Sequence, residues 1–216
     1  YVSFSSEIPC SRKEDREDGS SFFIEVIKSP TYLSAVSPLA HPPSNNAKIS
    51  VNTRHKCFFF IADWHSLTTH PHPGDVTANV RKILSEYLAC GIDPEKAAIY
   101  VQSDVKEVLE LYLYLNMNAY LGELQRVTSF KEKARKQPEN VNAGLLTYPT
   151  LMAADILIHR ADKVPVGKDQ EQNMEMARKF ARRFNTIYGV EFFPEPQSYS
   201  FGGDAIKVPG LDGSGK

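Results

Sequence analysis

The chain has 216 residues, 42% of them hydrophobic, and a formal net charge of −1 at pH 7. This length suits one sizeable α/β core, and the balanced charge gives no global field toward nucleic acid or an anionic membrane. The longest apolar runs fall short of the ~20 residues that span a bilayer, and the N-terminus lacks the pattern of a signal peptide. Three separated cysteines, Cys10, Cys57 and Cys90, favour a reducing, intracellular setting over a disulfide scaffold or structural zinc.

Residues 1–55 differ in composition from the rest of the chain. Runs such as SRKEDREDGSS (11–21) and SPLAHPPSNN (37–46) are typical of coil or linker. FFIEVI (22–27) could form a short strand. We expect this atypical segment to be poorly ordered as a whole, and the folded core to cover 56–216.

Three apolar runs of this core are typical of buried parallel strands: CFFFIAD (57–63), AAIYVQSD (97–104) and KVPVG (163–167). A further short strand is expected in AIKVPGLDGSGK (205–216), which ends in a glycine-rich loop. Helical patterns separate these strands. Alternating buried strands and helices predict an α/β fold, a Rossmann-like, doubly wound parallel sheet.

The helical patterns cover 75–91, two helices within 105–136, 148–159 and 171–189. In the first of them Asp75 is expected as the N-cap and Gly91 as the stop, whereas Pro149 lies near the first turn of the fourth. The region of about 105–140 is thus a helical insertion. Its surplus of tyrosine and leucine indicates a helix–helix or subunit interface.

Polar residues follow the predicted strands, where ligands of doubly wound sheets bind. They are Asp63, Trp64 and His65, then Gln102 and Ser103, then Gly167, Lys168, Asp169 and Gln170, and the 210–216 loop. A phosphate-bearing ligand would find Gly167, the N-terminus of the 171–189 helix, and Lys216 in a glycine-rich loop. No complete GxGxxG or GxxxxGK[ST] occurs within the 216 residues, so we expect neither a dinucleotide fingerprint nor a P-loop.

Asp155 is an acid in the middle of an apolar helical run, LTYPTLMAADILIH (146–159). Apolar residues flank it on both sides, which disfavours a solvent-facing position. Tyr148 and Met152 precede it by seven and three residues, and these offsets place all three side chains on one helix face. The pattern therefore predicts a buried carboxylate.

Four blocks resemble the catalytic domain of the tryptophanyl-tRNA synthetase family of class I enzymes: FFFIADWHSLTTH (58–70), GELQRVTSFKEK (122–133), LLTYPTLMAADIL (145–157) and VPVGKDQEQ (164–172). The terminal GSGK (213–216) resembles the start of the family's KMSKS loop, cut after its first lysine. The resemblance covers about Cys57 to Lys216. It implies a truncated class I catalytic core.

The resemblance also implies a reaction and its partners. The carboxylate of L-tryptophan would attack the α-phosphate of ATP, with Mg²⁺ on the phosphates, to give tryptophanyl-adenylate and pyrophosphate. The acyl group would then pass to tRNA(Trp). A homodimer is expected, with no membrane association, and a cytoplasmic location, although an organellar one is left open.

The resemblance assigns tryptophan-binding residues: His65, Gln102, Tyr148, Met152, Asp155, Val164, Val166 and Gln170. Asp155 would accept the indole N–H, which is a donor only. The implied ATP-binding residues are Gly167, Lys168, Asp169, Val208 and Lys216, with Lys216 as the catalytic residue that reaches the phosphates. No metal-binding residues are predicted, because His70 and His72 in a proline-rich loop are more typical of a solvated loop.

The sequence also departs from the family. A HIGH-type signature is missing upstream of Cys57, so the first strand and several ATP contacts are expected to have no counterpart. Asn173 stands where the family usually has histidine. One hypothesis is that 1–55 is unrelated sequence joined to a truncated core. Two functions therefore stay open, a synthetase catalytic fragment and a non-catalytic remnant that binds tryptophan or nucleotide or serves as an interaction module.

Overall fold

The computed structural model describes residues 21–26, 56–89, 91–167 and 170–199, the first of these ranges by its backbone alone. Its strands are β1 (Ser21–Val26), β2 (Lys56–Ile61), β3 (Ala97–Val101), β4 (Lys163–Pro165) and β5 (Gln197–Tyr199). Its α-helices are α2 (Asp63–Ser66), α3 (Pro73–Ala89), α4 (Glu107–Met117), α5 (Leu121–Arg126), α6 (Thr128–Lys136), α7 (Ala143–Leu157) and α8 (Glu171–Tyr188). The 3₁₀ helices are η2 (Leu67–Thr69), η3 (Gln102–Asp104) and η4 (Pro138–Asn140).

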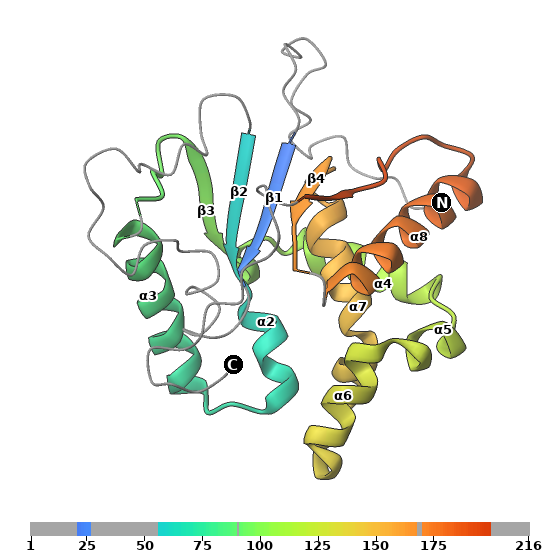
Figure 1. Cartoon of the computed structure of the whole chain (residues 1–216), viewed down its shortest axis with the longest axis horizontal. Helices are drawn as coiled ribbons and strands as arrows, with labels where there is room; N and C mark the ends of the chain where they lie inside the picture. Colours follow the sequence, from blue (N-terminus) through green and yellow to red (C-terminus); the bar gives the residue numbers. More distant parts are fainter. Residues whose placement is uncertain (1–20, 27–55, 90, 168–169, 200–216) are drawn as a thin grey trace.

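The strands form one parallel sheet in the order β3-β2-β1-β4-β5 (Figure 1). The chain enters at the centre, runs outward through β2 and β3, and then returns to the other side for β4 and β5. This reversal beside β1 is the switch point of a doubly wound sheet. The predicted Rossmann-like α/β fold is confirmed.

The central strand β1 comes from the segment that was expected to be poorly ordered as a whole. Residues 21–26 pair in parallel with Lys56–Ile61 of β2, and Phe22 pairs with Lys163 of β4. The strand pattern at 22–27 is therefore confirmed, one residue earlier, whereas the expectation that the first strand has no counterpart was wrong. Residues 21–26 form a strand although the composition around them is typical of coil. The rest of 1–55 lies outside the described residues.

Strand β2 is covered on both faces, which explains its continuous apolar run. Phe60, fully buried, belongs to the larger core cluster with side chains of α4, α7 and α8. Cys57, Phe59 and Ile61 point to the opposite face and pack with Tyr87 of α3. Figure 1 shows the same division, with α3 on one side of the sheet and α7 and α8 on the other.

Helix α7 begins five residues before its predicted start. Asn142 is its N-cap, and the side-chain oxygen of Asn142 accepts the Leu145 N–H at 3.2 Å. Pro149 lies inside the helix, so the interpretation of Pro149 as a first-turn residue was wrong. A proline there removes one helical hydrogen bond. Ten of the fifteen residues of α7 are buried, and this packing stabilises the helix despite the proline.

The limits of α3 and α8 were predicted with mixed success. Helix α3 starts at Pro73, so Asp75 lies in its first turn and the predicted N-cap was wrong. The predicted stop is confirmed, because Gly91 has a φ of 86° that favours glycine. Helix α8 likewise ends at Gly189, with a φ of 64°.

The helical insertion contains three α-helices, α4 to α6, where two were expected. Strand β5 had no predicted counterpart, and the strand expected within 205–216 lies outside the described residues. Among the described helices, none combines the length and the apolar character needed to cross a membrane.

Candidate functional site

The Asp155 carboxylate lies 1% exposed on α7 and makes three polar contacts. Nε2 of Gln102 donates to both of its oxygens, at 2.8 and 2.9 Å. Nε2 of His65 lies 2.8 Å from Oδ2. An unpaired carboxylate at such a depth would cost several kcal/mol. These contacts explain why the helix tolerates an acid among apolar residues.

Burial holds the pKa of the Asp155 carboxyl well above its usual range, and the negative charge of Asp63 acts in the same direction. The Gln102 amide opposes this shift, because it donates to the carboxylate and so favours the charged form. Burial and the Gln102 hydrogen bonds therefore act on the pKa of this carboxyl in opposite directions, with burial the stronger.

Gln102 and Asp63 fix the ends of β2 and β3 against each other. The Gln102 side-chain oxygen accepts the Trp64 N–H at 3.0 Å, which orients the Gln102 amide nitrogen toward Asp155. Oδ1 of Asp63 accepts the backbone N–H groups of Trp64 and Ser103, at 3.0 and 3.1 Å. The expected convergence of polar residues at these strand ends is confirmed.

Tyr148 of α7 contacts the His65 ring. The two ring centroids are 4.4 Å apart. The ammonium group of Lys133, from α6, lies 3.2 Å from the Tyr148 ring centroid, a cation–π contact. Because Tyr148 and Asp155 both contact His65, their predicted placement on one face of α7 is confirmed.

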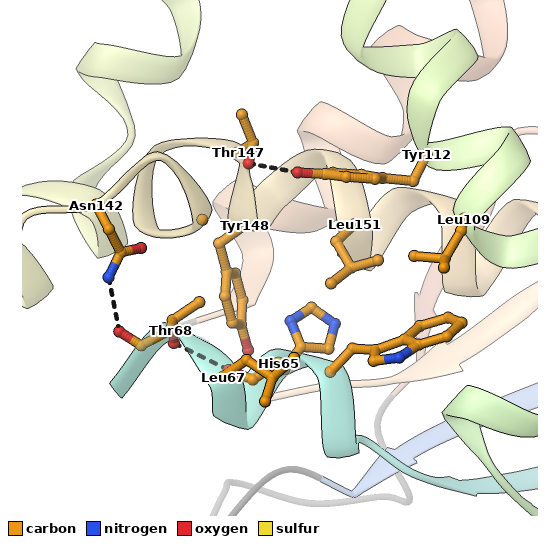
Figure 2. Close-up of a pocket in the computed structure, with 11 residues that line it drawn as sticks. His65, Leu67, Thr68, Leu109, Tyr112, Asn142, Thr147, Tyr148 and Leu151 are labelled. Carbon is orange, nitrogen blue, oxygen red and sulfur yellow. Dashed lines mark hydrogen bonds between the residues drawn. The ribbon is translucent and has the colours of Figure 1, made fainter. Parts of the chain in front are cut away.

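A pocket of about 190 Å³ opens beside His65 and Tyr148 (Figure 2). Its other lining residues are Trp64, Leu67, Thr68, Leu109, Tyr112, Asn142, Gly144, Thr147 and Leu151. The pocket is mostly apolar, with a hydrogen bond of 2.6 Å between the Tyr112 and Thr147 hydroxyls on its wall. Of the predicted tryptophan-binding residues, it includes His65 and Tyr148.

The other predicted tryptophan-binding residues lie deeper or to one side. Gln102, Met152 and Val164 are fully buried. Val166 packs against the same core cluster. Gln170 accepts a hydrogen bond from the Asn173 amide at 2.8 Å. Asp155 therefore lies beneath the pocket, and an indole ring reaches it only if the side chains around it move.

Of the predicted ATP-binding residues, the structure describes only Gly167. Gly167 is exposed, and its carbonyl accepts the Gln170 N–H at 2.9 Å in a turn before α8. Lys168, Asp169, Val208 and Lys216 lie outside the described residues. Their roles stay predictions.

No sequence pattern pointed to a second polar pair, the partly buried Tyr100 and His159. The Tyr100 hydroxyl and Nε2 of His159 are 2.6 Å apart, and the His159 ring stacks on Phe58 with centroids 4.4 Å apart. Burial lowers the pKa of His159 to about 4, helped by the positive charge of Lys56. Burial raises the pKa of Tyr100, and the charge of Asp155 adds to this shift. Tyrosine is thus the donor and neutral histidine the acceptor.

His159 is expected to make the folded state sensitive to acid. The unfolded chain takes up a proton at this histidine below about pH 6.5, whereas the folded protein does so only near pH 4. The free energy of unfolding should therefore fall as pH falls through this window, by about 2 kcal/mol at pH 4.5 relative to pH 7. Urea unfolding of the parent and of His159→Gln at both pH values measures it. An equally steep loss in the variant would contradict the assignment.

Comparison with known proteins places this geometry in a family. A family model described as tRNA synthetases class I (W and Y) matches residues 45–216. The chain is 83% identical over 168 residues to the tryptophan--tRNA ligase of Porphyromonas gingivalis, which covers 78% of this chain and 51% of that protein. It is 44% identical over 149 residues to the Clostridium tetani enzyme of the same name, or 68% of this chain and 44% of that one. The chain spans about half the length of these curated relatives.

Solved structures agree with the sequence relatives. Tryptophanyl-tRNA synthetase from Campylobacter jejuni superposes with a TM-score of 0.75 at 33% identity, over 91% of this chain and 59% of that chain. A structure of the same enzyme complexed with ADP and tryptophan gives a TM-score of 0.74 at 33% identity, over 90% and 59%. The family match starts at residue 45, somewhat before the core limit expected at 56, and extends to the last residue. The chain belongs to the class I tRNA synthetases of the tryptophanyl and tyrosyl group.

Proposed function

We propose that this chain carries the tryptophan-recognising part of a tryptophan--tRNA ligase, which activates L-tryptophan with ATP and transfers it to tRNA(Trp). The observation that carries the proposal is the buried Asp155 carboxylate, held by Gln102 and His65. A carboxylate offers about four lone-pair sites, and three contacts are made here. The remaining site suits the indole N–H of tryptophan, which only donates. The names of the similar proteins support the same substrate.

Recognition at Asp155 requires a local rearrangement. Asp155 is 1% exposed, and Met152 and Val164 are fully buried near it, so the ring has to displace packed side chains. Binding coupled to such a change is a form of induced fit. A ligand without an N–H would displace the same side chains and still leave the site without its donor. Selectivity for tryptophan follows from that difference.

ATP and Mg²⁺ are part of the same proposal. A similar synthetase has been solved with ADP and tryptophan, which supports a nucleotide site in this family. In the described ranges, no three or more His, Cys, Asp or Glu side chains gather into a metal-binding group. We place Mg²⁺ on the phosphates of ATP as part of the substrate, and the role of Lys216 there stays a prediction.

Calorimetry with tryptophan and then ATP, followed by tryptophan-dependent ATP–pyrophosphate exchange, tests the function. We expect binding and exchange with L-tryptophan and neither with L-phenylalanine. Tryptophan binding without exchange would favour the non-catalytic alternative. Absence of tryptophan binding would overturn the proposal. Exchange near that of a complete relative would contradict the hypothesis that 1–55 is unrelated sequence.

We also propose that the chain forms a homodimer through α4. Leu109, Leu113 and Met117 lie four residues apart along one helix face and are 44%, 55% and 76% exposed. Tyr120 and Leu121, which follow α4 in the chain, are 64% and 59% exposed. Exposed apolar side chains gathered in one segment are typical of interaction sites. A cytoplasmic location belongs to the same proposal, in keeping with the reducing setting that the cysteines favour.

Charges on this face of α4 are expected to dissociate the dimer. The double variant Leu113→Glu/Met117→Glu would bury two carboxylates in the interface and should sediment as a monomer. Leu88→Glu is the matched control, because Leu88 is 48% exposed on a different helix, α3. Analytical ultracentrifugation of the three proteins decides. A parent that already sediments as a monomer would contradict the dimer.

A further inference from the structure

The backbone carbonyl of Thr68 accepts hydrogen bonds from three side-chain amides. Nδ2 of Asn142 lies 3.0 Å away, Nε2 of Gln137 3.2 Å and Nδ2 of Asn140 3.4 Å. Figure 2 shows the contact between Asn142 and Thr68. A carbonyl oxygen has two lone pairs, so three donors exceed its ordinary capacity. We call the side chains of Gln137, Asn140 and Asn142 the amide clasp.

Thr68 connects the clasp to the buried site. Its hydroxyl donates to the His65 carbonyl at 2.9 Å, and η2, which contains Thr68, directly follows α2. Helix α2 has four residues, about one turn, so its own hydrogen bonds hold it weakly. Leu67, next to Thr68, is 54% exposed and adds little packing. The His65 ring contacts Asp155 and Tyr148 of α7, and polar contacts from outside α2 add to these in setting its position.

The clasp itself is tied to the start of α7. The side-chain oxygen of Asn142 caps this helix at the Leu145 N–H, while its nitrogen holds Thr68 and contacts Oδ1 of Asn140 at 2.8 Å. The Gln137 amide also donates to the Asn140 carbonyl at 3.0 Å. One residue, Asn142, thus joins α2 to the helix that carries Tyr148 and Asp155.

Gly144 shows how closely the two parts approach. A Cβ atom at this position would lie 3.2 Å from Oδ1 of Asn142 and 3.2 Å from Cγ2 of Thr68. Both distances are tighter than an ordinary carbon contact. The segment after the clasp therefore packs against η2 without space for a side chain, which is what a rigid connection requires.

We propose that Gln137, Asn140 and Asn142 are positioning residues of the tryptophan site. They hold Thr68, and through it Trp64 and His65, in register with α7. Loss of the clasp should leave α2 mobile relative to Asp155 and Tyr148, and so weaken tryptophan binding more than nucleotide binding. The kinetic part of this inference rests on the proposed function, whereas the structural part does not.

Asn142→Asp removes the hydrogen bond to Thr68 and keeps the cap of α7. Aspartate caps a helix as well as asparagine does, so α7 keeps its start, but the donor to Thr68 is replaced by an acceptor. Gln137→Met removes the second donor at similar length. Glu139→Gln is the matched control, because Glu139 is exposed in the same segment and is not one of the three donors to the Thr68 carbonyl. The double variant Gln137→Met/Asn142→Asp should show the largest effect on α2. If the double variant does not fold, Asn142→Asp alone tests the inference.

Trp64, the one tryptophan of the chain, reports on α2 without any activity. We expect acrylamide quenching of its fluorescence to rise about twofold in the clasp variants and to stay unchanged in Glu139→Gln. We also expect KM for tryptophan to rise about fivefold per lost contact while KM for ATP stays constant.

Unchanged Trp64 quenching would overturn the inference, and so would an equal rise of both KM values. A parent without tryptophan-dependent activity would contradict the proposed function instead. The quenching result would then decide the role of the clasp by itself.

Discussion

Asp155→Ala is expected to lower kcat/KM for tryptophan by roughly 10⁴-fold. The substitution removes the acceptor for the indole N–H. It also leaves the buried Gln102 amide, which in the parent donates to both carboxylate oxygens, without an acceptor. Tryptophan-dependent ATP–pyrophosphate exchange measures the loss. Where exchange is slow, the dissociation constant of tryptophan from calorimetry gives the binding part of the effect.

Two further variants separate recognition from stability. Asp155→Asn keeps one acceptor oxygen, so its loss should be smaller than that of Asp155→Ala. Asp75→Ala removes an exposed acid of α3, a helix that contributes none of the site residues described above, and should bind tryptophan like the parent. If Asp155→Ala keeps the parent's preference for tryptophan over phenylalanine, Asp155 is not the indole acceptor.

The sequence was sufficient to place the parts of this site but not their contacts. Rules on parallel sheets brought His65 and Gln102 to neighbouring strand ends, and helical spacing placed Asp155 with Tyr148. Both results concern single elements or adjacent strands. The contact between His65 and Asp155 joins residues 90 positions apart, and the orientation of each side chain depends on packing that no local pattern contains.

The missed features have a common physical cause. Pro149 is a local signal for a helix start, but burial of most of α7 stabilises a helix that begins at Ala143. The strand at 21–26 was placed outside the core because of its coil-like surroundings, and pairing with β2 and β4 overrides them. The amide clasp has an even weaker signal. In the sequence alone, nothing distinguishes Gln137, Asn140 and Asn142 from ordinary linker residues. Their common partner, Thr68, lies about seventy positions earlier in the chain.

Phe60→Ala is expected to lower the free energy of unfolding by about 3–5 kcal/mol. Phe60 is fully buried in the larger core cluster, and its ring centroid lies 5.9 Å from that of Tyr100 in a stacked arrangement. Urea unfolding measures the loss, with Leu88→Ala as the control. Leu88 is 48% exposed on α3, so its truncation should change the free energy by less than about 0.5 kcal/mol.

The position of Phe60 adds a functional consequence to this loss. Phe60 lies near the end of β2, and the residues that follow this strand are Asp63, Trp64 and His65. A ligand that binds only the folded state adds to its stability in proportion to the logarithm of its concentration over its dissociation constant. If the cavity stays local, saturating tryptophan should stabilise Phe60→Ala and the parent equally. If the cavity also shifts α2, the variant gains less from tryptophan than the parent does. A loss below about 1 kcal/mol with unchanged tryptophan stabilisation would show that this face of β2 is not the core on which the site rests.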